Sequence, residues 1–180
     1  LLVQYSTAVK PGQVVRISGD PVAMPLVEAV YEHVLRAGGH PMVRLMPEAL
    51  QAVFYECASD EQLKFVNPLT VQEVSTIDAS IGIWAENNTK NLSRVDPKRH
   101  GMASAAQKDL WKIFMTRAAE GKMRWCGTLY PTLGNAQDAE RSLRDYERFV
   151  FQAGHLDKDD PVAAWKTIAA KQQKVVDYLN

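Results

Sequence analysis

The hydrophobic and polar positions along the chain form two kinds of segment, short apolar runs rich in Val and Ile and longer amphipathic stretches. Short runs of this kind are typical of buried strands, and apolar residues three or four positions apart are typical of helices. Four strands are predicted, at residues 14–19, 41–47, 78–85 and 122–129, with centres at Val15, Val43, Ile81 and Cys126.

Helical spacing fills the stretches between these strands. Val27, Val30 and Val34 mark one face of a first helix, which Gly38 stops. Ser59 is placed to cap a short helix at its N-terminus. The predicted helices after the first lie at residues 48–57, 60–66, 97–121, 142–150 and 161–180.

The last of these helices has the clearest start. Asp160 is expected as its N-cap and Pro161 as its first residue, a position where proline is favoured. Its apolar stripe consists of Trp165, Ile168, Ala169, Val176 and Leu179.

Alternation of strands with long helices predicts crossover connections and therefore a parallel sheet covered on both sides. The fold class expected is α/β, a small doubly wound, mainly parallel four-stranded sheet with helices on both faces, of flavodoxin or Rossmann type. The 180 residues are enough for one such domain, and no linker or internal repeat divides them.

Composition and charge exclude some classes of binding partner and cellular location. The 21 basic and 21 acidic residues balance, so no net charge attracts nucleic acid or an anionic membrane. No apolar run approaches the ~20 residues of a membrane span. Residues 1–5 lack the Met and basic start of a secretory signal and look like the tail of a helix. Cys57 and Cys126 are expected to be buried, reduced thiols, which points to a cytoplasmic location.

Common ligand motifs are missing. The first strand ends in Gly19-Asp20-Pro21, not in a three-glycine turn, and no phosphate-binding loop occurs, so nucleotide binding is not expected. No histidine shows metal-ligand spacing: His33 falls on the first helix, His40 just after it, His100 in an exposed basic turn, and His155 after a glycine. The acidic residues 157–160 directly precede a helix, whose dipole accounts for them without a metal.

The loops at the carboxyl ends of the strands are better candidates, because ligands gather there in open α/β sheets. They are Gly19-Asp20, Pro47-Glu48, the segment 86–89 and the segment 130–132. Two interpretations stay open for residues 86–89: Asn88 or Thr89 caps the following segment, or the loop lines a cleft shared with a second domain. The candidate lining residues are Glu86, Asn88, Thr89, Tyr130 and Thr132.

Several blocks of sequence, in their order and spacing, resemble one enzyme family. They are residues 9–12, 37–41, 58–63, 86–89, 91–97 and 130–132. In this arrangement the chain resembles the N-terminal domain of the thermophilic-type metallo-aminopeptidases, the aminopeptidase T and aminopeptidase S family. Gly134 and Arg141 depart from what the resemblance leads us to expect.

The resemblance implies a larger two-domain hydrolase that releases N-terminal amino acids from peptides. Its two divalent ions, which could be cobalt, zinc, manganese or magnesium, would be held by Glu, His and Asp residues of a C-terminal metal-binding domain after residue 180. The implied partners are that domain, a peptide substrate and a second subunit in a homodimer, all in the cytoplasm. No catalytic or metal-binding residue is assigned within residues 1–180, so this segment is expected to be inactive alone.

Two alternatives remain open. The chain could be a non-catalytic α/β binding or interaction domain. It could also be the matching domain of a metal-dependent ring-cleaving dioxygenase of similar fold.

Overall fold

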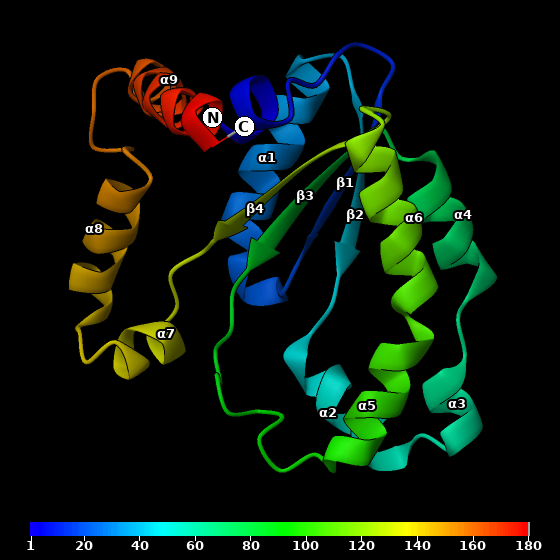
Figure 1. Ribbon diagram of the computed structural model, residues 1–180. Helices are drawn as coiled ribbons and strands as arrows, with labels where there is room; N and C mark the ends of the chain where they lie inside the picture. The colour runs from blue at the N-terminus through cyan, green and yellow to red at the C-terminus, as the bar shows by residue number, and fades with distance from the viewer. Residues whose placement is uncertain (180) are drawn as a thin grey trace.

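The computed structural model describes residues 1–179 and contains a four-stranded sheet between layers of helices (Figure 1). The strands are β1 (Val14–Gly19), β2 (His40–Leu45), β3 (Ala79–Trp84) and β4 (Arg124–Leu129). They lie in the order β2-β1-β3-β4, and every neighbouring pair is parallel. The predicted α/β class, the parallel sheet and all four strand positions are thereby confirmed.

An apolar layer fills the space between the sheet and helix α1 (Met24–Arg36). Val15 and Ile17 of β1 and Ile81 of β3 are fully buried here, because their side chains alternate toward α1 along each strand. Val30 and Val34 of α1 pack against them. Helix α1 ends where Gly38 takes a left-handed φ of +77°, as the sequence predicts.

Helices α4 (Pro68–Thr76) and α6 (Lys108–Ala119) cover the opposite face of the sheet (Figure 1). Val74 and Phe114 are buried in this second layer. The layer also holds charges: Glu73 lies between Arg16 and Arg44, with N···O distances of 3.2 and 3.0 Å. The side chains of Arg16 and Glu73 are largely withdrawn from water, so their charges need one another as partners, whereas the side chain of Arg44 is 39% exposed.

Two helix predictions need correction. The single helix expected at residues 97–121 is divided into α5 (Pro97–Ala106) and α6, because the chain tightens at Gln107, whose N–H is shared by the carbonyls of Ala103 and Ser104. The bend lets α5 pack on α3 (Asp60–Lys64) while α6 packs on α4. His100 lies on α5 and not in a turn, although it is exposed as expected.

The second correction concerns the segment after residue 57. Helix α3 (Asp60–Lys64) ends two residues earlier than predicted, and α4 was not predicted at all. Phe65 is extended, and the side chain of Asn67 then caps α4 by accepting from the N–H of Leu69 at 2.9 Å. The cap at Ser59 is as expected, with a reciprocal bond from Gln62.

Both cysteines differ from the prediction of burial. Cys57 is exposed and Cys126 is only partly buried, and both are free thiols. Cys57 ends α2 (Glu48–Cys57), a helix beyond the end of the sheet that has no buried residue. Edge strand β4, which carries Cys126, has no strand on its outer side within residues 1–179.

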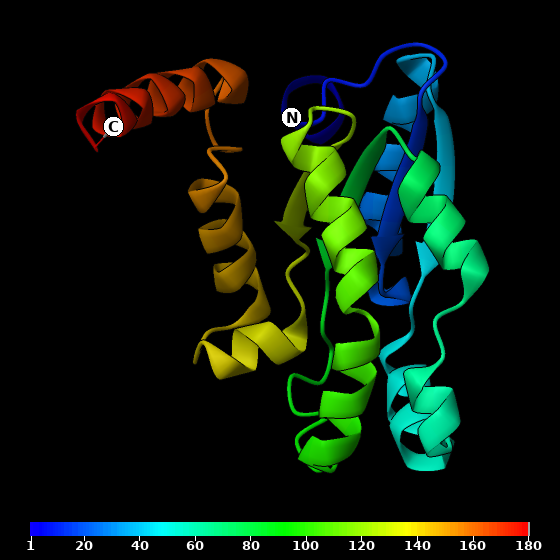
Figure 2. The same cartoon turned by 45° about the vertical axis from the view of Figure 1, so that its right-hand side comes forward.

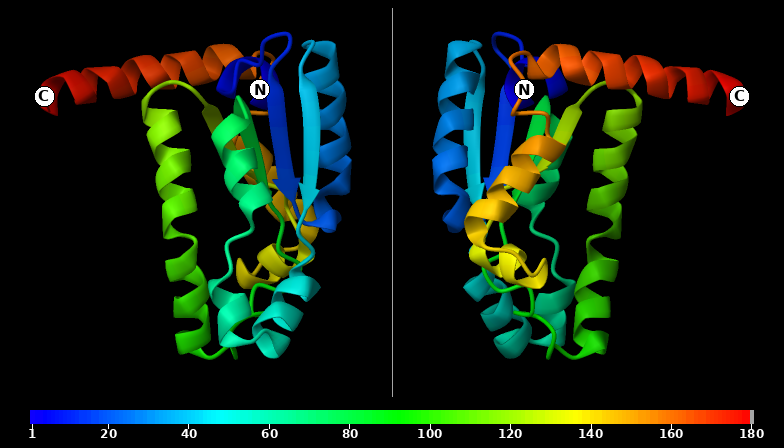
Figure 3. Two further views of the ribbon diagram at one scale, coloured as in Figure 1. Left: turned by 90° about the vertical axis from the view of Figure 1, so that its right-hand side faces the viewer. Right: turned by 90° about the vertical axis from the view of Figure 1, so that its left-hand side faces the viewer.

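After β4 the chain leaves the sheet through α7 (Leu133–Asp138) and α8 (Leu143–Ala153) (Figure 2). Helix α9 (Pro161–Leu179) then extends away from the body of the molecule (Figure 3). Asp160 caps it as expected, accepting from the N–H of Ala163 at 2.9 Å. We call α8 and α9 together the arm; neither helix contains a buried residue within the described part of the chain.

Two short turns complete the described chain. A π-helical turn (Leu2–Ser6) packs beside β4, and a 3₁₀ turn (Pro21–Ala23) leads into α1. Among residues 1–179, no helix has the length and apolar character that crossing a membrane requires.

Candidate functional site

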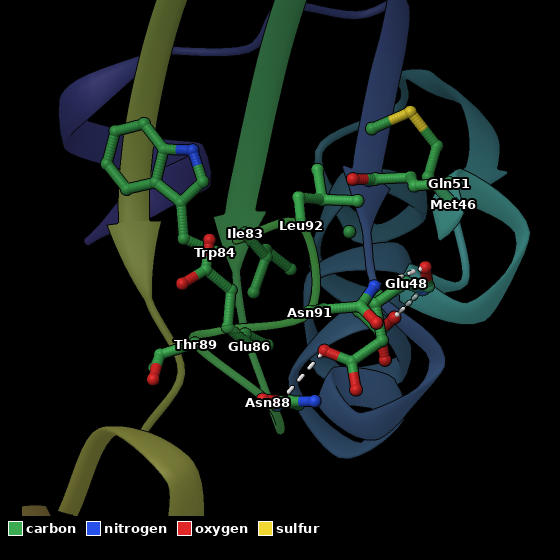
Figure 4. Close-up of a pocket in the computed structure, with 13 residues that line it drawn as sticks. Met46, Glu48, Gln51, Ile83, Trp84, Glu86, Asn88, Thr89, Asn91 and Leu92 are labelled. Carbon is green, nitrogen blue, oxygen red and sulfur yellow. Dashed lines mark hydrogen bonds between the residues drawn. The ribbon is translucent and has the colours of Figure 1, made fainter. Parts of the chain in front are cut away.

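The candidate site is a hollow of about 210 Å³ at the carboxyl ends of the strands (Figure 4). Loops after β1, β2 and β3 form its wall, as expected where neighbouring parallel strands end at one edge. The lining residues are Gly19, Asp20, Met46, Glu48, Gln51, Ile83, Trp84, Ala85, Glu86, Asn88, Thr89, Asn91 and Leu92.

Three of the five residues singled out from the sequence lie in this wall. Glu86, Asn88 and Thr89 line the hollow from the loop after β3. The side chain of Asn88 also accepts from the N–H of Lys90 at 3.1 Å, so it shapes the local turn as well as facing the hollow. The capping interpretation thus describes a bond that Asn88 makes, and the residue also lies at the wall of this hollow.

Tyr130 and Thr132 do not line the hollow. Tyr130 packs against the apolar layer on the α1 side of the sheet, and its N–H bonds the carbonyl of Trp84 at 2.8 Å. Thr132 is buried, and its hydroxyl donates to the backbone carbonyl of Glu86. Tyr130 is thus tied to the end of β3 and Thr132 to the loop that follows it.

Two carboxylates tie the loops of the site together. Asp20 accepts from the N–H of Val22 at 2.9 Å with one oxygen and from the N–H of Glu48 at 2.8 Å with the other. Glu48 in turn accepts from the N–H groups of Asn87 and Asn88, at 3.1 and 3.2 Å. A charged acceptor strengthens each bond, so the conformation of the loop after β3 depends on a residue of α2.

Sequence reasoning pointed to the loops that carry Asp20 and Glu48 but did not select these two residues. Their signal is their position: Asp20 directly follows β1 and caps the turn at Pro21–Ala23, and Glu48 is the first residue of α2. At such positions a carboxylate can satisfy free N–H groups. The partner of Glu48 is 39 residues away, and that pairing could not be read from the sequence.

The wall of the hollow is acidic. Asp20, Glu48 and Glu86 are among its lining residues, and no Lys, Arg or His is. A wall of one charge sign disfavours ligands of the same sign. The hollow is therefore poorly suited to phosphate groups, in agreement with the missing phosphate-binding motifs.

Contacts between the loop after β3 and α7 form what we call the seam: Thr132 with Glu86, Gly134 with Asn87, and Thr89 and Lys90 with Asp138. A Cβ atom on Gly134 would lie 2.4 Å from the carbonyl oxygen of Asn87, so only glycine fits. Gly134, unexpected from the family resemblance, thus has a packing reason.

One titrating group belongs to the seam. The hydroxyl of Thr89 donates to the carboxylate of Asp138, and the ammonium of Lys90 lies 2.9 Å from its other oxygen. The hydrogen bond from Thr89 is the larger cause and that from Lys90 the next, and together they hold the pKa of Asp138 below its ordinary value.

A metal site does not fit the residues present. Within residues 1–179, no three His, Cys, Asp or Glu side chains come together in a way that could hold a metal ion. Of the three carboxylates at the hollow, those of Asp20 and Glu48 already accept backbone N–H groups.

A second, more open hollow of about 720 Å³ lies between α2, α3, α5 and α6. Its lining includes Phe54, Tyr55, Leu63 and Trp111 and is mostly apolar. None of the residues selected from the sequence lies there.

Comparison with known proteins supplies what the geometry alone does not. The sequence pattern of the thermophilic metalloprotease family (M29) matches residues 1–180. The chain belongs to this family. The suspected relation to the thermophilic-type aminopeptidases is thereby confirmed.

Two known proteins are similar to the chain. Aminopeptidase 2 of Geobacillus stearothermophilus is 25% identical over 190 residues, a match covering 100% of this chain and 46% of that protein. A solved structure, wild-type AmpT from Thermus thermophilus, superposes with a TM-score of 0.73 at 18% identity, over 92% of this chain and 43% of that one. The chain spans less than half the length of each relative, and the structural likeness shows a shared fold.

Proposed function

We propose that residues 1–180 form the N-terminal, non-catalytic domain of a two-metal aminopeptidase, whose metal ligands lie in a following domain. The extent of the family match carries this proposal, because it takes in the whole chain but under half of aminopeptidase 2. The described residues offer no ligand set, whereas a two-metal hydrolase needs several carboxylate or imidazole ligands. The parent protein would hydrolyse N-terminal peptide bonds, with two cobalt, zinc, manganese or magnesium ions held by that following domain.

In this proposal the hollow at the carboxyl edge is one wall of the cleft between the two domains. Glu86, Asn88 and Thr89 face the cleft, and Tyr130 and Thr132 hold their loop in place from behind. The acidic wall of the hollow supports this role. An acidic wall suits the protonated amino group of a peptide better than an anionic ligand.

The resemblance also implies a homodimer in the cytoplasm, and both belong to the proposal. An exposed free thiol at Cys57 fits a reducing compartment. Sedimentation of the parent protein at micromolar concentration tests the dimer.

Reading the parent open reading frame and assaying both proteins tests the main proposal. We expect leucyl-anilide hydrolysis by the parent with added cobalt, zinc, manganese or magnesium, and none by residues 1–180 alone. Metal-dependent turnover by the 180-residue chain that a substitution within it abolishes would contradict the proposal. A reading frame that adds no metal-binding half would instead favour a free-standing interaction domain.

Substitution of Glu86 in the parent tests the cleft wall. For Glu86→Gln we expect KM for peptide substrates to rise about three- to tenfold with kcat nearly unchanged, because a group that binds without taking part in the reaction affects mainly KM. Glu28→Gln is a matched control: Glu28 is also exposed, but it lies on α1 and not in the hollow. Equal effects of the two substitutions would remove Glu86 from the cleft.

A further inference from the structure

The hollow at the carboxyl edge has an aromatic side as well as an acidic one. Trp84, the last residue of β3, lines it and is 61% exposed, although tryptophan is on average highly buried. Its six-membered ring lies over Gly127 of β4, where an added Cβ atom would be 2.5 Å from one ring carbon and 2.9 Å from another. Because glycine leaves this space free, the sheet supports one part of the indole while most of it stays open to solvent.

Glu86 follows two residues after this tryptophan. Side chains alternate along an extended chain, and Ala85 between the two is 3% exposed, so Trp84 and Glu86 project to the same side of the sheet. Figure 4 shows the carboxylate of Glu86 extending from the loop after β3 toward the indole. One end of the hollow therefore presents an aromatic surface together with a carboxylate.

The carboxylate of Glu86 is available to a ligand. Within the described residues 1–179 it forms no ion pair, whereas those of Asp20 and Glu48 already bind backbone N–H groups. No Lys, Arg or His is among the lining residues, so no cation of the wall competes for it. Lys90, the next basic residue along the loop, is paired with Asp138.

We propose that Trp84 and Glu86 form a subsite for a basic side chain of the peptide substrate, arginine before lysine. An aromatic face attracts a cation, and a planar guanidinium group can stack on that face while a carboxylate accepts its N–H groups. This inference rests on the proposed function, which supplies the peptide. It goes beyond that function by naming the kind of side chain that this wall selects and the two residues that select it.

The volume of the hollow and its chemistry favour a side chain over other cationic ligands. About 210 Å³ is less than the roughly 300–1,000 Å³ of sites for drug-sized molecules, so a single side chain suits it. A single carbon atom separates the α-ammonium group of a peptide from the carbonyl that is hydrolysed, so that group has to lie at the metal ions, for which the described residues offer no ligand set. A long basic side chain extends away from that carbonyl and can reach the opposite wall of the cleft.

Binding of blocked amino acids to the 180-residue chain tests the subsite without the following domain. The probes are N-acetyl-argininamide and N-acetyl-citrullinamide, which are nearly identical in shape and differ in side-chain charge. In NMR titrations followed at the amides of residues 85–92 and the indole N–H of Trp84, we expect the arginine derivative to bind about fivefold tighter, the factor for a cation–π contact at an exposed site.

Variants assign the preference to the two residues. Trp84→Leu removes the aromatic face and Glu86→Gln removes the charge, and each should lower the affinity for the arginine derivative about three- to fivefold. Trp111→Leu is the matched control, since Trp111 is 60% exposed but lies on α6 and does not line this hollow. Thermal midpoints show which variants fold, and the exposed position of Glu86 keeps the test valid if Trp84→Leu does not.

The parent protein tests whether the bound group belongs to the substrate. With peptides that contain arginine, Glu86→Gln and Trp84→Leu should raise KM about threefold more than with the same peptides containing citrulline, while kcat stays nearly unchanged. Equal changes for the two peptides would refute a subsite for the substrate side chain.

Two results with the 180-residue chain would overturn the inference. Equal affinity for the arginine and citrulline derivatives would refute the subsite. Binding of leucinamide, which has a free α-ammonium group, without binding of N-acetyl-argininamide would show that the wall takes the α-ammonium group instead. Both results leave the proposed function intact, because that function fails only if the parent lacks metal-dependent hydrolysis.

Discussion

The sheet with α1, α4 and α6, and the arm formed by α8 and α9, contain helices with similar amphipathic patterns but bury them to different extents. Val27, Val30 and Val34 of α1 are at most 3% exposed. Neither arm helix has a buried residue within the described chain, although Tyr146 and Val150 mark a continuous apolar side of α8. The difference shows that an apolar stripe in the sequence does not by itself determine whether the helix is buried within this segment of chain.

The seam is what connects these two regions. Its contacts hold α7 against the loop after β3, and α7 in turn leads into α8. The shape of the candidate site and the direction of the arm therefore depend on the same few side chains. Substitutions in the sheet, seam and arm should have effects of decreasing size.

The largest effect is expected in the sheet. Ile81 is fully buried, and Ile81→Ala should lower the free energy of unfolding by about 3–4 kcal/mol through lost burial and the cavity left behind. Val176→Ala in the arm should change it by less than about 0.5 kcal/mol. Urea unfolding of both variants measures the contrast, and similar losses would show that the arm belongs to the same cooperative unit.

The next largest loss of stability is expected at Gly134, where the seam is most closely packed. Gly134→Ala should destabilise the protein by about 2 kcal/mol, because the new methyl group meets the backbone oxygen of Asn87 and the loop must move. Gly101→Ala is the matched control. Gly101 lies in α5 with open space around it, so alanine there should stabilise the helix by up to about 1 kcal/mol. Thermal midpoints that shift in the same direction would contradict this account.

Removing the carboxylate of Glu48 should cause a smaller loss of stability, confined to the loop after β3. Glu48→Ala leaves the N–H groups of Asn87 and Asn88 without their acceptor and should cost about 1.5 kcal/mol, with about tenfold faster exchange of these two amides. Glu48→Gln should restore part of the loss because it keeps an acceptor oxygen. Glu56→Ala, at an exposed position of the same helix, should leave the exchange of these amides unchanged. Faster exchange in Glu56→Ala would show that α2 as a whole, and not the carboxylate of Glu48, holds the loop.

The smallest effect concerns pH. Since the folded pKa of Asp138 lies below its ordinary value, its contribution is present above the unfolded pKa and is lost as pH falls through the folded pKa. Because the group is exposed, the change should be confined to the seam. In NMR titrations, Thr89→Val should raise the pKa of Asp138 more than Lys90→Met does, since the Thr89 hydrogen bond is the larger cause. The reverse order would make the Lys90 ion pair dominant.

The sheet was predictable because local and global signals agree there. Val15, Val43, Ile81 and Cys126 all lie in the expected strands, and intervening helices require parallel neighbours. Helix α4 was missed although Asn67 as N-cap and Pro68 as first residue are a local start signal. The bend at Gln107 follows from packing on two different helices, which no local pattern reports.

For the candidate site, the sequence predicted the edge of the sheet at which it lies but not the side-chain contacts that form it. Topology places the ends of parallel strands at one edge, so Glu86, Asn88 and Thr89 were expected there. That Tyr130 and Thr132 face away from the hollow depends on where β4 ends and on which side each side chain points. Which N–H groups Glu48 would bind depends on contacts across 39 and 40 residues.

By itself the sequence determined the four strands, the starts of most of the predicted helices and the family, because these depend on neighbours within a few residues or on the order of short blocks. Only the tertiary structure decided which carboxylates hold the loops, why Gly134 admits no side chain, and which half of the α9 stripe stays uncovered. Such features arise from contacts between residues far apart in the chain, whose geometry exists only once the sheet has formed.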